Sequence, residues 1–246
     1  MNMIFKALVL LASMTASLAH ASFTPSPFSA IYSLSKAGMA VGETTVTLSK
    51  LGNNEYLYTS SSKTTGLAAM FIDDTVIEQS RFTIKNSTIR MLEYNYTHSG
   101  KPHKNRKQVY DWKNNIAREQ VAKQKWEIKL QPESIDKHAY RYAIMMDITN
   151  HKDNIQYSIA DDDKLATYSF VQQEPVEIHT ALGDLKTNRL KMERDKKTSI
   201  LFWCAPELGN LPVRVEKDST KNGKLTLKLI SVNGEFFSAK YQSLQK

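Results

Sequence analysis

Cys204 is the only cysteine of the chain, and it lies in the stretch FWCAPELGNLPVRVE at 202–216. A lone thiol could act as a nucleophile, but a catalytic cysteine needs a base, usually histidine, and an electropositive setting that lowers its pKa. The sequence offers no local histidine for that role. Pro206 removes a backbone donor and biases Ala205 toward extended geometry, so we expect a strand to end there. We therefore interpret Cys204 as a buried packing residue at a structural corner.

The histidines could ligate a metal, and beyond residue 21 they are His98, His103, His138, His151 and His179. Metal sites on strands and helices use pairs at i, i+2 and i, i+4, and no two of these histidines have either spacing. His98 and His103 flank a Gly-Lys-Pro turn and could approach each other across a hairpin, which is the one alternative that the spacing leaves open. The acidic run at 161–163 lacks the ligand pattern of a calcium loop. We predict no metal and no cofactor.

Short catalytic motifs are missing from the sequence. It has no G-x-S-x-G elbow, no H-E-x-x-H, no P-loop and no G-x-G-x-x-G. We therefore predict a non-enzymatic protein with no catalytic residues. Glycosidase carboxylates carry no short motif, so a hydrolase that acts on a cell-wall or host polymer is kept as an alternative.

Residues 1–21, MNMIFKALVLLASMTASLAHA, read as a signal peptide with an A-x-A cleavage site, so we expect cleavage near Ala21/Ser22. No segment approaches the about 20 apolar residues that a membrane-spanning helix needs. Residues 22–246 are predicted to form a single exported β-rich domain, periplasmic or secreted, with no membrane span.

The chain has a formal net charge of +8. Export would remove it from genomic nucleic acid, so we predict no nucleic-acid partner and expect anionic lipids or acidic glycans as counter-charges. The densest basic runs, KPHKNRK at 101–107 and ERDKK at 193–197, fall where turns are expected. We interpret both runs as solvated loops.

Apolar and polar residues alternate with period two in many short windows, which indicates half-buried strands. In VGETTVTLSKL at 41–51, the alternation divides the residues between two faces: Val41, Glu43, Thr45, Thr47 and Ser49 on one, and Gly42, Thr44, Val46, Leu48 and Lys50 on the other. Turn signals separate the strands, and those at 183–184 and 222–223 match tight hairpins. The predicted fold is mainly β: a single strongly curved antiparallel sheet, or a partly open β-barrel, with one principal helix packed across it.

That helix is predicted over about 133–148, where Ile135, Ala139, Tyr142, Ala143 and Met146 recur at helical spacing. Apolar residues surround nearly all of it, so it should be buried on more than one side. A shorter segment, TTGLAAMFID at 64–73, is predicted to form a single helical turn between two strands.

Several stretches together resemble the bacterial periplasmic family called domain of unknown function 3108. They are YSLSKAGMAVGETTVTL near the start, the Ser-x-Phe of QSRFTI, VYDW, SIDKHAYRYAIMMDI, TALGDLKTNRL and FWCAPELGNLPVRVE. Within them, Tyr32, Gly38, Gly42 and Glu43 match the family pattern, as do Trp203, Pro206, Leu208 and Leu211-Pro212-Val213. The resemblance implies an exported, mostly β domain and no established reaction. Cys204 departs from the family, which more often has an aromatic or apolar residue there.

Aromatic residues and methionines in the strands favour a binding role for an amphipathic ligand, a lipid or a glycan, held in a curved sheet. The predicted contact residues lie on or near the helix and its sheet floor: Trp112, Trp126, Tyr140, Arg141 and Met145. An ordinary filled core is equally compatible with this composition. In that case the protein would be a scaffold that binds a protein partner in envelope or secretion machinery.

Overall fold

Fifteen strands form one sheet in the computed structural model, which describes residues 26–234 except 53, 70–73, 196–197 and 222. The strands are β1 (Phe28–Lys36), β2 (Met39–Gly52), β3 (Glu55–Thr64), β4 (Thr75–Lys85), β5 (Thr88–His98), β6 (Arg106–Asp111), β7 (Ile116–Val121), β8 (Gln124–Lys129), β9 (Ile135–Asp136), β10 (Ile155–Asp161), β11 (Lys164–Thr180), β12 (Gly183–Asp195), β13 (Thr198–Ala205), β14 (Leu211–Ser219) and β15 (Leu225–Asn233). The helices are α1 (Gly66–Ala69), α2 (Tyr140–Thr149) and the short 3-10 turns η1 (Pro102–Lys104) and η2 (Pro206–Leu208). The predicted signal peptide at 1–21 lies outside the described residues.

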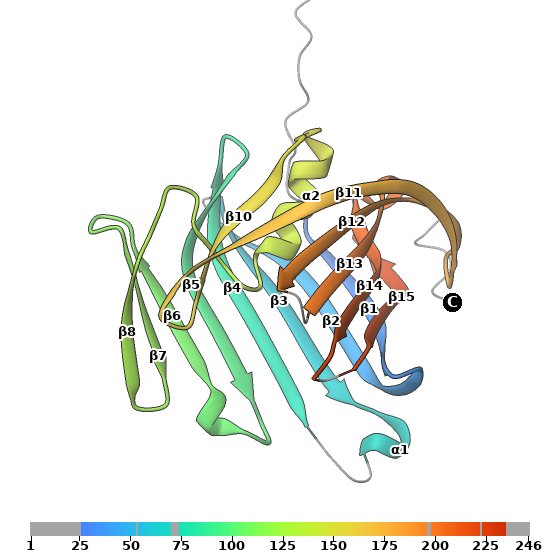
Figure 1. Ribbon diagram of the computed structural model, residues 1–246, viewed down its shortest axis with the longest axis horizontal. Coiled ribbons are helices and arrows are strands. Elements are labelled where there is room, and N and C mark those ends of the chain that lie inside the picture. The colour runs from blue at the N-terminus through green and yellow to red at the C-terminus, as the bar shows by residue number, and fades with distance from the viewer. Residues whose placement is uncertain (1–25, 53, 70–73, 196–197, 222, 235–246) are drawn as a thin grey trace, which may run out of the picture.

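The first and last strands lie side by side within the sheet. β1 pairs with β2 on one edge and with β15 on the other, where Ser29 is opposite Asn233. From this seam one antiparallel meander runs outward to β8, and a second runs back through the chain from β15 to β10. The only parallel pair among the described strands joins β9 to β10. Figure 1 shows the sheet curving around α2, with β10 and β11 crossing over it, so the predicted curved, mainly antiparallel sheet is confirmed.

Period-two alternation places one face of each strand inside. In β2, Gly42, Thr44, Val46 and Leu48 of one predicted face are buried, whereas Lys50 at the end of that face is exposed. The strand β7 was not predicted, since IAREQV alternates with few strongly apolar residues. β11 is one long strand, although its sequence divides into two stretches of alternating residues that each predict a strand, ATYSFVQQ and VEIHTAL. The register with β12 is irregular between Gln173 and Val176, where the two stretches meet.

The predicted helix over 133–148 begins later than expected. α2 covers Tyr140–Thr149, whereas Glu133 has a left-handed φ of 62° and Ile135 lies in β9. The prediction was wrong over 133–139 because Asp136 Oδ1 accepts the backbone N–H groups of His138 at 2.7 Å and Ala139 at 2.6 Å. Those donors are therefore not given to carbonyls four residues earlier, as a continuous helix requires.

α2 is buried on several sides, as its sequence predicts. Tyr140, Tyr142 and the run 143–146 are all buried, and Tyr142 stacks on Phe82 of β4 with ring centroids 5.7 Å apart. The helix thus fills the interior that the curved sheet leaves open. The short helical turn predicted in 64–73 is confirmed as α1, while Met70, Phe71 and Ile72 lie outside the described residues.

FWCAPELGNLPVRVE forms the expected corner. β13 ends at Ala205, η2 follows, Gly209 takes a left-handed φ of 61° and β14 starts at Leu211. Cys204 is fully buried, and burial raises the pKa of its thiol well above the ordinary value. A thiol in this setting stays protonated and packs as a small apolar group.

Candidate functional site

A cleft of about 550 Å³ opens beside the first turn of α2, between β4–β6 on one side and β10–β14 on the other. Its volume lies within the range of about 300–1,000 Å³ that is typical of small-molecule sites. The lining residues are Glu78, Tyr96, His103, Lys104, Arg106, Val121, Lys137, Tyr140, Arg141, Asp161, Tyr168, Met192, Thr198, Ile200 and Lys217.

One wall of the cleft is apolar. Tyr140 from α2 meets Tyr168 of β11 edge to face, with centroids 5.5 Å apart. Met192 and Ile200 from the paired strands β12 and β13 are opposite each other in the register and continue this wall. All four side chains are buried in the fold, so this wall is held by the core behind it.

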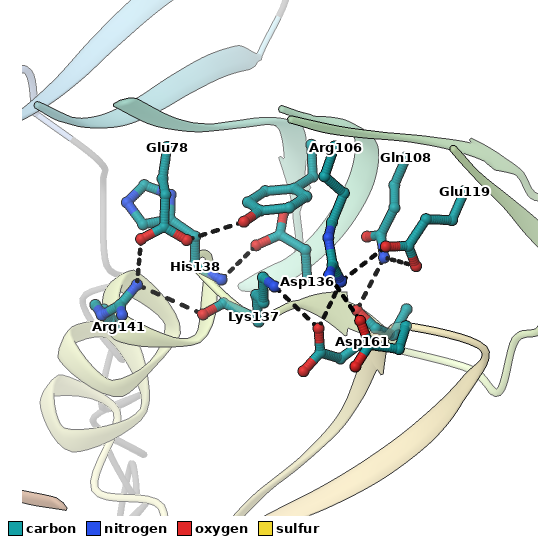
Figure 2. A network of polar contacts seen from close by, with 12 residues as sticks. Glu78, Arg106, Gln108, Glu119, Asp136, Lys137, His138, Arg141 and Asp161 are labelled. Carbon is teal, nitrogen blue, oxygen red and sulfur yellow. Dashed lines mark hydrogen bonds and ion pairs between the residues drawn. The ribbon is translucent and has the colours of Figure 1, made fainter. Parts of the chain in front are cut away.

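The opposite wall contains a hub of charges around Arg106 on β6 (Figure 2). Its Nη1 atom lies 2.8 Å from Glu119 Oε1 and 2.9 Å from Asp161 Oδ1, and its Nη2 atom lies 2.6 Å from Asp162 Oδ1. Lys137 also pairs with Asp161, at 3.1 Å. Arg106 and Lys137 therefore have their charges matched by carboxylates of this protein.

Buried Glu119 is held mainly by this hub. Burial raises the pKa of Glu119, although Gln108, which donates to its Oε2 at 2.8 Å, and Arg106 oppose that shift. Gln108 also donates to the backbone carbonyl of Ala160 at 3.2 Å and so ties β6 to β10. The hub joins the two meanders across the interior, which indicates a structural role.

Arg141 and Glu78 form a second, looser pair on the cleft floor (Figure 2). Arg141 Nη1 lies 3.8 Å from Glu78 Oε2, and Tyr94 donates its hydroxyl to Glu78 Oε1 at 2.9 Å. Burial alone would raise the pKa of Glu78, but Arg141 and the hydrogen bond from Tyr94 outweigh it and leave that pKa below its ordinary value. Glu78 is therefore a carboxylate at neutral pH.

Behind the cleft floor, β4 places Ser80 between two titratable groups. Ser80 Oγ donates to Asp136 Oδ1 at 2.9 Å and lies 2.9 Å from His138 Nδ1, and all three side chains are fully buried. Burial raises the pKa of Asp136 to about 7 and lowers the pKa of His138 to about 3. Since Ser80 already donates its proton to Asp136, we assign the proton of neutral His138 to Nδ1.

This trio differs from a catalytic triad in its order. In a triad, histidine lies between the nucleophile and the carboxylate, so that it can take the proton of the serine. Here serine lies between histidine and carboxylate, and Tyr58 stacks on His138 with centroids 4.7 Å apart. The arrangement fixes the turn before α2 against β4, and it positions no base for Ser80.

No group of three or more histidine, cysteine, aspartate or glutamate side chains is suited to hold a metal within the described ranges. His98 lies 3.1 Å from Asp74, Nδ1 to Oδ1, whereas His103 lines the cleft. No described helix is long and apolar enough to span a membrane.

Two of the five predicted contact residues line the cleft: Tyr140 and Arg141. Met145, one turn after Arg141 in α2, is buried and does not line the cleft. Trp112 donates its Nε1–H to the carbonyl of Met91 at 2.7 Å and carries Arg90 over its ring at 4.6 Å. Trp126 lines a separate groove of about 410 Å³ on β6–β8. The structure thus brings the first two together and places the other three elsewhere.

Sequence reasoning missed most of the cleft. The run 101–107, interpreted as a solvated turn, supplies His103, Lys104 and Arg106 to it. The run 193–197 includes residues outside the described ranges. Asp161 was noticed only as part of the acidic run 161–163, which was judged as a calcium loop and set aside. Glu78 gave no signal, because a single acidic residue on a strand is ordinary in sequence.

Stretches that carry the family resemblance meet inside the protein. Ser80 of QSRFTI contacts Asp136 and His138 of SIDKHAYRYAIMMDI. Tyr32 of the first strand donates its hydroxyl to the carbonyl of Pro212 at 2.9 Å. These matched residues therefore hold distant parts of the fold together.

A family model described as protein of unknown function (DUF3108) matches residues 28–230. The search of curated proteins gave no match. Among solved structures, a β-barrel-like protein of domain of unknown function DUF1849 from Brucella abortus has a TM-score of 0.57 at 10% identity, covering 85% of this chain and 98% of that chain. This likeness shows the fold alone.

Two further solved structures have lower TM-scores. The hypothetical protein CT021 from Chlamydia trachomatis has a TM-score of 0.35 at 10% identity, covering 88% of this chain and 90% of that chain. The "putative exported protein with YmcC-like fold" from Bacteroides fragilis has a TM-score of 0.34 at 9% identity, covering 86% of this chain and 98% of that chain.

Proposed function

We propose that this protein, which belongs to the DUF3108 family of proteins of unknown function, is an exported, non-enzymatic binding protein that holds an amphipathic lipid or glycan in its cleft. The carrying observation is the cleft of about 550 Å³, which has an apolar wall around Tyr140 and a charged wall around Arg106. A ligand with a polar and an apolar part matches both walls at once. Export is supported by the signal-peptide pattern in residues 1–21.

A binding role is favoured over hydrolysis by the state of the cleft carboxylates. A glycosidase needs one carboxylic acid with a raised pKa to protonate the leaving group. Glu78 has a lowered pKa beside Arg141, and Asp161 is paired with both Arg106 and Lys137. The lowered pKa of Glu78 disfavours a proton donor there, and the oxygen of Asp161 that faces the cleft cations is already taken by two ion pairs.

A binding role is also favoured over a scaffold role. The large exposed hydrophobic residues among the described positions come from several different elements: Met39, Leu51, Val109, Val171, Val176 and Ile230. Singly exposed apolar residues are normal on a protein surface. The cleft, in contrast, brings apolar and charged side chains together in one concave lining.

The test blocks the cleft from within. Thr198 lines it from β13, and its neighbour Ser199 does not line it and points to the opposite face of the strand. Both variants T198W and S199W should fold, and native mass spectrometry of gently purified protein should show retained ligand for wild type and S199W and loss of it for T198W. Two results would overturn the proposal. One is a T198W variant that retains as much ligand as wild type, and the other is a wild-type protein that carries no ligand after export into the periplasm of a bacterial expression host.

A further inference from the structure

The cations that line the cleft differ in how closely they are paired with carboxylates. Lys104, Arg106, Lys137, Arg141 and Lys217 line it together with only two carboxylates, Glu78 and Asp161. Asp161 is already shared by Arg106 and Lys137, and Arg106 also has Glu119 and Asp162 behind it. Of the other lining cations, Lys104 has no carboxylate within ion-pair distance among the described residues, and Arg141, on the floor, has only the distant Glu78.

Arg141 makes unusually few close contacts for a guanidinium, which has five N–H donors. Among the described residues, its polar contacts are the 3.8 Å approach to Glu78 and a 3.5 Å hydrogen bond to the carbonyl of Lys137. Its side chain is 36% exposed, and it lies over the ring of Tyr140 at 5.2 Å. This places the guanidinium within the range of a cation–π contact with Tyr140.

Glu78 pairs with Arg141 only at long range. Its Oε1 atom accepts the hydroxyl of Tyr94 at 2.9 Å, and its Oε2 atom faces Arg141 at 3.8 Å. The pair is therefore not the short, doubly hydrogen-bonded arrangement that an arginine and a carboxylate can form. Glu78 thus neutralises Arg141 at a distance and leaves donors that a second anion could take.

The surroundings of Arg141 define the rest of such a ligand. Tyr140 lies directly beneath the guanidinium, and Tyr168, Met192 and Ile200 continue the apolar wall from it. Lys104 of η1 adds a second cation at the cleft and has no carboxylate within ion-pair distance among the residues described.

We propose, on the basis of the binding function above, that Arg141 binds a compact anionic group, a phosphate or a carboxylate, of a ligand whose apolar part lies on the Tyr140 wall. Glu78 competes with that group for Arg141. Neutralising Glu78 should therefore strengthen anion binding, and neutralising Arg141 should abolish most of it.

The experiment is isothermal titration calorimetry on the exported form of the protein with four probes: dodecyl phosphate, dodecanoate, dodecyltrimethylammonium and inorganic phosphate. All alkyl probes are kept below their micelle concentrations. Dodecyl phosphate and dodecanoate should bind, and the cationic probe of equal chain length should bind at least about tenfold more weakly. Inorganic phosphate should bind more weakly than dodecyl phosphate because it lacks the apolar part.

Variants of Arg141 and Glu78 should change the affinity for the anion in opposite directions. R141Q should weaken dodecyl phosphate binding roughly 10-fold to 100-fold, the value of a charge-assisted contact, and E78Q should tighten it by about 3-fold to 10-fold. The exposed K104Q should weaken it about threefold without disturbing the fold, because single exposed charges contribute little. R118Q and E127Q change the same charges at an exposed pair, 3.2 Å apart, and should leave binding within about twofold.

The outcomes separate the two proposals. Equal binding of cationic and anionic probes, or an E78Q variant that binds more weakly while its unfolding curve is unchanged, would overturn the anion site but leave cleft binding in place. Binding of inorganic phosphate as tight as that of dodecyl phosphate, lost in R141Q, would support the anion site and overturn the amphipathic function. Binding of none of the four probes would overturn the anion site.

Discussion

Arg141 lies 3.8 Å from Glu78, Nη1 to Oε2, in the same protein in which Arg106 has three carboxylate partners at 2.9 Å or less. Both arginines line one cleft, so a survey of charged residues would group them. Their partners give them different roles. Arg106 forms ion pairs that stabilise the interior of the fold, whereas Arg141 has N–H donors that make no close contact.

Arg106→Gln should destabilise the protein by about 3–5 kcal/mol, because it leaves the buried carboxylate of Glu119 without its cation. Arg141→Gln should cost much less, since its pair is long and its side chain is partly exposed. Urea unfolding followed by circular dichroism measures both. Arg118→Gln, at an exposed site, is the control and should change the free energy of unfolding by less than about 1 kcal/mol. Equal costs for the Arg106 and Arg141 variants would contradict these different roles.

Asp136 and His138 should give pH dependences of opposite sign. Asp136 has a folded-state pKa of about 7 against an ordinary 3.8, so between these values only the unfolded chain has lost the proton and stability falls as pH rises. His138 has a folded-state pKa of about 3 against 6.5, so in that window only the unfolded chain binds the proton and stability rises with pH. From about pH 4 to 6.5 the two effects largely cancel.

Replacing either residue should reveal the effect of the other on how stability depends on pH. Asp136→Asn removes the falling contribution, so the free energy of unfolding should rise more steeply with pH than in wild type, by up to about 1.4 kcal/mol per pH unit. His138→Gln should give the reverse change in slope. Urea unfolding at intervals between pH 4 and 6.5 measures both, and parallel curves for wild type and both variants would refute the assignment.

Cys204 should be unreactive in the folded protein. Its thiol is fully buried and its pKa is raised by burial, so Ellman's reagent should label it only after unfolding in urea. Cys204→Ala should cost about 1 kcal/mol through lost packing, and Cys204→Ser about 1–3 kcal/mol, because it buries a hydroxyl in an apolar setting. Rapid labelling under native conditions would contradict a packing role.

Gly42→Ala should destabilise the β2–β3 pair. A Cβ atom at Gly42 would overlap the backbone carbonyl of Lys63, which cannot move without breaking the register. We expect a cost of about 1–3 kcal/mol by thermal unfolding. Glu43→Ala, the exposed neighbour on the other face, should stay within about 0.5 kcal/mol of wild type. A Gly42 variant as stable as the Glu43 variant would show that the strand accommodates the side chain.

The sequence was sufficient to predict the β class, the division of β2 into two faces, the corner around Cys204 and a helix through Tyr142, Ala143 and Met146. Each of these depends on neighbours within a few residues: side-chain alternation, the missing donor of a proline, or helical spacing. The start of the helix was mispredicted because the buried carboxylate of Asp136 takes the donors of the next turn, and nothing in its local spacing marks that carboxylate as buried.

Only the tertiary structure decided which charges are matched. Glu78, Lys104, Arg141 and Asp161 come from different elements far apart in the chain, and the curvature of the sheet around α2 brings them to one cleft. The energy that a charge contributes depends on the distance to its partners and on their burial. The type of a residue gives neither quantity. Arg106 and Arg141 are therefore indistinguishable as residue types in the sequence, but they have different roles in the fold.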